Sequence, residues 1–186
     1  MNEKIIPFTY RPSADKRRAF PLFFILIGCA AVFVAASLIS PLYRGLLSLA
    51  AVFLLTGAVL VYQRYITADY IYAVREGGEG EAAFVVTKRV GKRVTTLAYA
   101  QLYSIKCIEF FTKDEYKARA KDKNIRKYNF VPTYSPDYIY VISLKNPNGE
   151  FEIAVDITSE VRNRILEYRD YALADEVARR ESFDEE

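Results

Sequence analysis

The sequence predicts a membrane-anchored α+β protein, in which a two-helix transmembrane hairpin precedes a seven-stranded antiparallel β domain that a C-terminal α-helix caps. Three observations predict this fold. Residues 19–63 form two long runs without charge, which only Arg44 separates. Short β-type segments divided by turn residues follow from residue 66, and a helical pattern of apolar residues begins after Thr158. The expected organisation is a basic leader (1–18), the hairpin (19–63), the β domain with its helix (66–180) and an acidic tail (181–186).

Composition narrows the function classes. The chain has 186 residues and a formal net charge of +3, which is too small to indicate a nucleic-acid partner. It contains no His, and so lacks the commonest general base and metal ligand. We therefore expect no catalytic residue, no metal site, no cofactor and no enzyme activity. Cys29 and Cys107 fall in different regions and are not expected to pair, which suits a reducing compartment. Cys107 is expected to be a buried structural residue.

The leader places basic residues directly before the first apolar run. Lys16, Arg17 and Arg18 adjoin it, as in a signal peptide, but a signal-peptide core has only ~7–15 apolar residues. This run is longer and a second one follows at once. The positive-inside rule then predicts a cytoplasmic N-terminus. Pro7 and Pro12 argue against a helix before about residue 13.

The two uncharged runs predict helices at about 20–40 and 45–63. Leu22–Ile39 alone would span about 27 Å as a helix, close to the thickness of the hydrocarbon core. A short connection, Ser40–Arg44, joins the two helices and reverses the direction of the chain. Both termini are therefore expected in the cytoplasm, in a multi-pass protein of the plasma membrane. Neither span contains Asp, Glu, Lys or Arg, so the hairpin is expected to be an anchor in the lipid bilayer and not a transport pathway.

Small residues occur in both predicted spans and leave two interpretations open. The two helices pack on each other, or a spare small face forms a homo-oligomer. The residues concerned are Gly28, Ala30, Ala31, Ala35, Ala36, Ser48, Ala50, Ala51, Gly57 and Ala58.

Seven strands are expected in the β domain, at residues 69–76, 81–90, 93–100, 102–111, 128–134, 138–144 and 151–157. Gly77–Gly80 reads as a turn, Gly91-Lys92 as a type II′ turn, and Asn148-Gly149 as a hairpin turn. The last strand alternates apolar and polar residues and is expected to be buried on one face only. Residues 112–127 read as a short helix and a solvated connection.

The closing helix is expected at 159–180, with Thr158 and Ser159 as candidate caps. Val161, Ile165, Tyr168 and Ala172 recur every three or four residues and predict one face toward the sheet. Two basic groups lie outside the core pattern, around the second hairpin and in the loop. They are either solvated or in contact with anionic lipid headgroups. The candidate lipid-headgroup contacts are Lys88, Arg89, Lys92, Arg93, Lys117, Arg119, Lys121, Lys123, Arg126 and Lys127.

The order of elements, the Tyr-rich segment after the second span, and the stretch Ala98–Ile108 ending in LYSIKCI resemble a bacterial arrangement. Its members are membrane proteins with two transmembrane helices followed by a pleckstrin-homology-like (PH-like) domain. The resemblance implies a barrel plugged by the C-terminal helix. The first hairpin, Arg75–Glu81, is mainly acidic where phosphoinositide-binding members are basic, so it does not imply inositol-phosphate binding.

The function expected from the sequence is a non-enzymatic, membrane-anchored PH-like module. It would mediate interaction with a protein partner that the sequence does not identify, or scaffold or sense the membrane surface. The alternative is a regulatory or accessory subunit of a membrane transporter or envelope enzyme, which it contacts through the hairpin.

Overall fold

The computed structural model describes residues 6–76, 81–120, 125–146 and 149–184. The chain divides into two compact units. The hairpin unit comprises Ser13–Ala68 and Pro132–Ser135. The sheet unit comprises Met1–Pro12, Asp69–Val131 and Pro136–Glu186.

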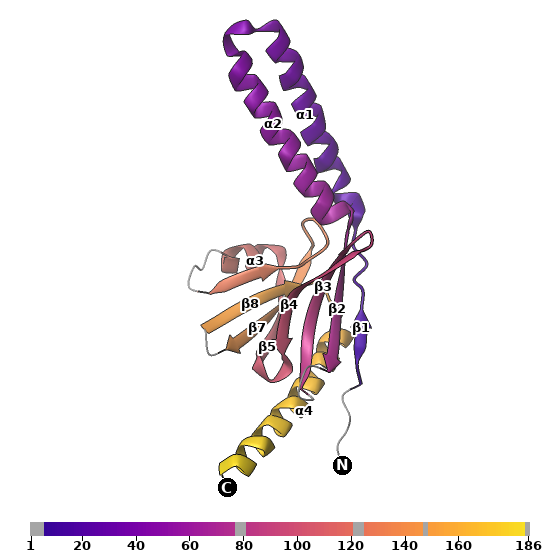
Figure 1. Ribbon diagram of the computed structural model, residues 1–186, viewed down its shortest axis with the longest axis vertical. Helices are drawn as coiled ribbons and strands as arrows, with labels where there is room; N and C mark the ends of the chain where they lie inside the picture. The colour runs from indigo at the N-terminus through magenta and orange to yellow at the C-terminus, as the bar shows by residue number, and fades with distance from the viewer. Residues whose placement is uncertain (1–5, 77–80, 121–124, 147–148, 185–186) are drawn as a thin grey trace. The chain divides into compact units, whose positions relative to one another are not determined.

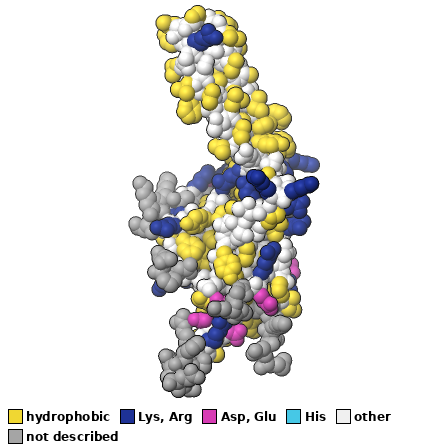
Figure 2. Space-filling view, in the orientation of Figure 1, with side chains coloured by type: hydrophobic (Ala, Val, Ile, Leu, Met, Phe, Trp, Pro, Cys, Tyr) yellow, Lys and Arg dark blue, Asp and Glu magenta, His cyan; other side chains and the backbone are white. Residues whose placement is uncertain are grey.

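Helices α1 (Phe20–Ile39) and α2 (Arg44–Val61) form the hairpin, joined through a single 3-10 turn at Pro41–Tyr43. With the helical turns that adjoin them, they give two continuous helical segments of 24 and 26 residues. Both are long and apolar enough to cross a membrane, and only 11% of the most apolar stretch of each is buried. Hydrophobic side chains cover the visible face of the hairpin (Figure 2).

Small residues lie where the two helices pack together. Ala30, Ala51 and Ala58 are almost completely buried, which lets the backbones approach closely. The hydroxyl groups of Ser37 and Thr56 form hydrogen bonds within their own helices. Ser37 Oγ donates to the Val34 carbonyl over 2.7 Å, and Thr56 Oγ1 donates to the Val52 carbonyl over 2.9 Å. The hairpin therefore exposes little besides apolar surface along its length.

Residues 133–135, from much later in the chain, contact the open end of the hairpin. The Asp15 backbone N–H donates to Thr133 Oγ1 over 3.3 Å, and Arg18 Nη1 donates to the Ser135 carbonyl over 3.2 Å. The rings of Tyr65 and Tyr134 meet edge to face, with centroids 5.5 Å apart. The second part of the leader, from Ser13, and the loop Pro132–Ser135 thus belong to the hairpin unit.

Two four-stranded sheets make up most of the sheet unit (Figure 1). Sheet A has the order β1-β2-β3-β4, and sheet B has the order β5-β7-β8-β6. The strands are β1 (Phe8–Tyr10), β2 (Ala68–Glu76), β3 (Ala82–Val90), β4 (Arg93–Gln101), β5 (Ile105–Thr112), β6 (Arg126–Asn129), β7 (Tyr138–Asn146) and β8 (Gly149–Val155).

The expected seven-stranded antiparallel barrel is wrong in three respects. The sheets do not close on each other, since β4 and β5 are not paired and a 3-10 turn at Leu102–Ser104 joins them. The leader supplies an additional strand, β1, which pairs antiparallel with β2. Finally, β6 pairs with β8 in parallel, because the chain between β5 and β6 forms helix α3 (Lys113–Ala120) before it returns to the sheet.

The core contains the side chains that the alternating strands direct inward. Tyr72, Phe84, Ile142 and Ile153 are each 0–1% exposed. The Tyr72 hydroxyl donates to the Phe130 carbonyl over 3.0 Å and accepts the Asp156 backbone N–H over 3.2 Å. One buried hydroxyl therefore links β2 of sheet A to the ends of β6 and β8 in sheet B. Burial, the largest cause, raises the pKa of Tyr72 far above its usual value.

Helix α4 (Ser159–Asp184) begins at the expected cap, where Thr158 Oγ1 accepts the Val161 N–H over 3.3 Å. It continues to Asp184, into the segment expected to be a tail. Ile165, Tyr168 and Ala172 are buried, as their spacing predicts. Two arginines of α4 donate to backbone carbonyls of the edge strand β5, Arg162 to Ile108 and Arg169 to Lys106. The helix thereby covers an edge that would otherwise offer free carbonyl groups.

The expected type II′ turn is confirmed. Val90 pairs with Arg93, and Gly91 has a φ of 59°. Lys92 does not have a positive φ, so only the first turn residue does, as type II′ requires. The Gly77–Gly80 turn and Asn148 lie outside the described residues, and the pairing of β7 with β8 extends to Asn146 and Gly149.

Candidate functional site

A row of four polar side chains crosses sheet B. Cys107 pairs with Ser143, Ser143 with Glu152, and Glu152 with Lys127, so the row runs through β5, β7, β8 and β6. Side chains of directly paired residues lie on the same face of a sheet. The register therefore gathers a thiol, a hydroxyl, a carboxylate and an ammonium group on one face of sheet B.

Helix α3 covers part of this face, and its first turn fixes where it starts. Glu115 accepts hydrogen bonds from both the backbone N–H and the hydroxyl of Thr112, each over 2.8 Å. This is the carboxylate half of a capping box. The backbone hydrogen bond, followed by the hydroxyl, lowers the pKa of Glu115. Seven residues after Thr112, the last turn of α3 presents Arg119 to the polar row.

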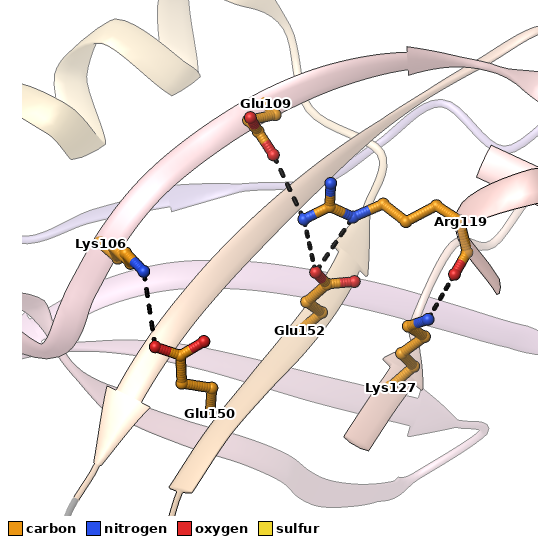
Figure 3. A network of polar contacts seen from close by, with 6 residues as sticks. All are labelled: Lys106, Glu109, Arg119, Lys127, Glu150 and Glu152. Carbon is orange, nitrogen blue, oxygen red and sulfur yellow. Dashed lines mark hydrogen bonds and ion pairs between the residues drawn. The ribbon is translucent and has the colours of Figure 1, made fainter. Parts of the chain in front are cut away.

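Arg119 makes the central ion pair of the site. Its Nε and Nη2 donate to Glu152 Oε1 over 3.0 and 2.6 Å, and Nη2 lies 3.4 Å from Glu109 Oε2 (Figure 3). The guanidinium carbon lies 4.9 Å from the centroid of the Phe111 ring. Lys127 Nζ donates to the Arg119 carbonyl. The hydrogen bond to Glu152, the largest cause, raises the pKa of Arg119 further.

A cavity of about 280 Å³ opens beside this ion pair. Polar residues on β5, α3, β7 and β8 line it, together with Ile125, Leu144 and Phe151. The polar lining residues are Lys106, Cys107, Glu109, Arg119, Ser143, Glu150 and Glu152. Lys106 Nζ lies 3.4 Å from Glu150 Oε1 at the exposed side.

Two buried polar atoms of the lining have no partner among the described residues. They are Oε2 of Glu152 and Oγ of Ser143. The side chain of Glu152 is only 4% exposed, and Arg119 satisfies just one of its two oxygens. A buried acceptor without a donor is costly, so this carboxylate is the chemically distinctive group of the cavity.

The sequence pattern did not reveal this site. In the alternating pattern of the last strand, Glu152 and Ala154 lie on the side that was expected to face solvent. This expectation is wrong. Both residues are buried, because α3 lies over this face of β8, where Tyr116 packs against the cluster that contains Ala154 and Arg119 binds Glu152. Cys107 is half-buried and unpaired with Cys29, and it borders the cavity instead of the core. The one sequence clue was a pair of carboxylates, Glu150 and Glu152, on either side of the half-buried Phe151.

The candidate lipid-headgroup residues fall into two groups in the sheet unit. Lys88, Arg89, Lys92 and Arg93 surround the β3–β4 turn, where all except the half-buried Lys88 are exposed. The second group lies on α3 and β6. There Lys117 pairs with Asp114 over 3.7 Å, Arg126 is exposed, and Arg119 and Lys127 are engaged as described above. Lys121 and Lys123 lie outside the described residues.

The chemistry available to the cavity follows from its charges. Among the residues that the structure describes, three carboxylates and two basic side chains line it. Within the described part of the chain, no group of three or more His, Cys, Asp or Glu side chains could hold a metal ion. The second oxygen of the Glu152 carboxylate keeps the capacity to accept a hydrogen bond.

In comparison with known proteins, the chain matches no family model, no curated protein and no solved structure.

Proposed function

We propose that the protein is a non-enzymatic module that its hairpin anchors in a membrane and that presents the sheet unit at the membrane surface. The observation that carries this function is the exposure of α1 and α2. Val32, Val52 and Leu38 are 68%, 59% and 72% exposed, and only 11% of each apolar stretch is buried. A lipid bilayer supplies the apolar surroundings that such a surface needs.

The orientation follows from charge. Lys16, Arg17 and Arg18 precede α1, and Arg64 follows α2, whereas the connecting turn carries Arg44 alone. This excess of basic residues at the open end favours cytoplasmic termini. A chain with the two native cysteines replaced by alanine and with Leu42→Cys should react with an impermeant thiol reagent from outside intact cells. Reaction only from the cytoplasmic side of inverted vesicles would contradict the orientation.

We further propose that the β3–β4 turn contacts anionic headgroups. Strands β2 and β3 are neighbours joined by residues 77–81, too few for a parallel crossover, so they run antiparallel. The turn at Gly91-Lys92 thus lies at the end of sheet A where β2 begins. The chain enters β2 directly from the helical turn Tyr62–Ile66 that follows α2. Each basic residue held near an anionic surface contributes about 1 kcal/mol.

Headgroup contact can be measured on the full chain in lipid nanodiscs that contain a gadolinium-labelled headgroup. The amide resonance of Gly91 should broaden, and more strongly when anionic lipid is present. Lys92→Glu with Arg93→Glu should reduce this dependence, whereas Lys117→Glu on α3 serves as the matched control. A Gly91 signal that no lipid composition affects would rule out the headgroup contact and leave the anchor intact.

The resemblance to PH-like domains supports a binding role for the sheet unit. Two facing sheets followed by a C-terminal helix are elements that such domains share, although here the sheets stay open. Crosslinking of the full chain in its native membrane tests the protein-interaction role. Crosslinks from the sheet unit would support a scaffold, and crosslinks confined to α1 and α2 would favour the accessory-subunit alternative.

A further inference from the structure

We propose that the β3–β4 turn inserts the side chains of Val90 and Val94 among the lipid acyl chains of the membrane. This inference rests on the headgroup contact proposed above for the same turn, and it adds the depth that the turn reaches. The partner of the two valines is the hydrocarbon directly beneath the headgroups. The sheet unit thereby gains an attachment to the membrane besides the hairpin.

The end of the β3–β4 ribbon is exposed on both of its faces. Every residue from Arg89 to Leu97 is exposed, whereas residues 82–87 of β3 are buried. Val90 and Val94 are 40% and 63% exposed. The described part of the chain thus leaves both valines uncovered, although the turn itself needs only the positive φ of Gly91. Exposed apolar side chains with polar neighbours are typical of sites that contact a membrane or a partner.

The strand register places one valine on each face of the ribbon. Val90 pairs with Arg93, and Arg89 pairs with Val94. Directly paired residues share a face and successive residues alternate, so each face carries a valine beside an arginine. An arginine can lay its apolar stem along lipid while its guanidinium group stays at the level of the phosphates. The turn can therefore enter the membrane interface without burying a charge.

Charge complementarity identifies an anionic lipid surface as the partner. Arg89, Lys92 and Arg93 are exposed next to the two valines, and the sequence has no acidic residue from 82 to 101. Binding in the membrane interface strengthens with the apolar area that is buried and with the attraction to anionic lipids. The valines and the basic side chains therefore favour the same position of the turn.

The test uses the full chain, with isotope-labelled valine methyl groups, in nanodiscs that contain anionic lipid. One sample carries a nitroxide near the start of a lipid acyl chain, and another carries the gadolinium-labelled headgroup. The nitroxide should broaden the methyl resonances of Val90 and Val94 and leave those of Val177 unchanged. Val177 is the matched control because it is 53% exposed and lies on α4. Arg179 of the same helix contacts Glu81, at the opposite end of β3 from the turn.

Val90→Thr combined with Val94→Thr keeps the branched side chains that suit a strand and replaces one methyl group of each with a hydroxyl. In this variant the nitroxide should broaden the Gly91 amide resonance less, by about twofold or more, because the apolar contact is weakened. The gadolinium-labelled headgroup should still broaden it. Val177→Thr should leave both effects on Gly91 as they are in the native chain.

The two labels separate this inference from the headgroup contact. Broadening of the Val90 and Val94 methyl resonances by both labels supports insertion. Broadening by the headgroup label alone would overturn the insertion and leave the headgroup contact standing. Broadening by neither label would overturn both. Equal effects of the nitroxide on Gly91 in the native chain and in the double variant would overturn the role of the valines.

Discussion

The hairpin unit and the sheet unit differ in how far their apolar side chains are exposed to solvent. In the sheet unit, Tyr72, Val141 and Ile142 lose essentially all solvent contact to their own chain. In the hairpin unit, Phe53 and Leu46 are each 68% exposed although both lie within α2. The sheet unit thus buries its own core, whereas the hairpin leaves much of its apolar surface exposed.

Polar groups differ in the same way. Ser37 and Thr56 bond to carbonyls three and four residues earlier in their own helices. Tyr72 and Arg119 instead join segments that lie 58 and 33 residues away in sequence. Hydrogen bonds within one helix suit a helix in lipid, because no water is present there to act as a hydrogen-bond partner. Long-range hydrogen bonds hold the two sheets and α3 in one arrangement.

The largest expected effect comes from placing the same charge in both units. Val52→Arg in α2 should prevent stable insertion, since an arginine at the centre of a span costs about 3 kcal/mol. Val177→Arg in α4 should be nearly neutral, although Val52 and Val177 are similarly exposed at 59% and 53%. The measurement is the fraction of protein in the membrane pellet. Equal behaviour of the two variants would contradict the difference between the units.

The second effect concerns the ion pair on sheet B. Arg119→Met should lower the free energy of unfolding of the sheet unit by about 3 kcal/mol, because it leaves the buried carboxylate of Glu152 uncompensated. Lys117→Met is the matched control on the same helix, since its ion pair with Asp114 is exposed. Urea unfolding followed by circular dichroism measures both. A loss as small as that of Lys117→Met would show that the pair does not hold α3.

The third effect tests the link between the two sheets. Tyr72→Phe should cost about 1–3 kcal/mol, because the Phe130 carbonyl and the Asp156 N–H each lose a partner. Tyr99→Phe is the control, as Tyr99 is 55% exposed on the edge strand β4. Thermal unfolding in detergent measures the difference between the two variants. Identical midpoints would mean that the hydroxyl contributes nothing to stability.

The smallest effect is a dependence on pH. Burial raises the pKa of Tyr72 above that of the unfolded chain, so its contribution is complete below about pH 10. Above that pH the unfolded state gains stability by ionising while the folded state does not, and the sheet unit should become progressively less stable. The loss between about pH 9 and pH 11 should be smaller in Tyr72→Phe. An unchanged slope in the variant would contradict this assignment.

The sequence was sufficient for the parts of the fold that local patterns determine. Uncharged runs predicted α1 and α2 because long apolar stretches without charge are typical of helices of this length. Gly91 predicted its turn because the positive φ at that position suits glycine. The spacing of Ile165, Tyr168 and Ala172 identified the buried side of α4 because a helix presents residues three and four apart on one face.

The remaining features depend on contacts between distant segments. Strand β1 is only three residues long and forms because β2 offers it a free edge. Phe8 then packs against Tyr168 of α4, with ring centroids 6.0 Å apart. The cavity could not be predicted either, because it also depends on contacts between segments that are distant in sequence. Alternation identifies two faces of β8, but only the position of α3, far away in sequence, shows that Glu152 is covered.

The most direct test of the membrane anchor is flotation of membranes from cells that express the full chain, after a wash at about pH 11. That wash removes peripheral proteins and lowers the stability of the sheet unit, because the unfolded chain can ionise Tyr72 whereas the folded state does not. The anchor predicts that the protein rises with the lipid through the density gradient, whereas the Val52→Arg variant does not. Release of the native chain into the dense soluble fractions would contradict the account, because α1 and α2 would then find their apolar surroundings elsewhere.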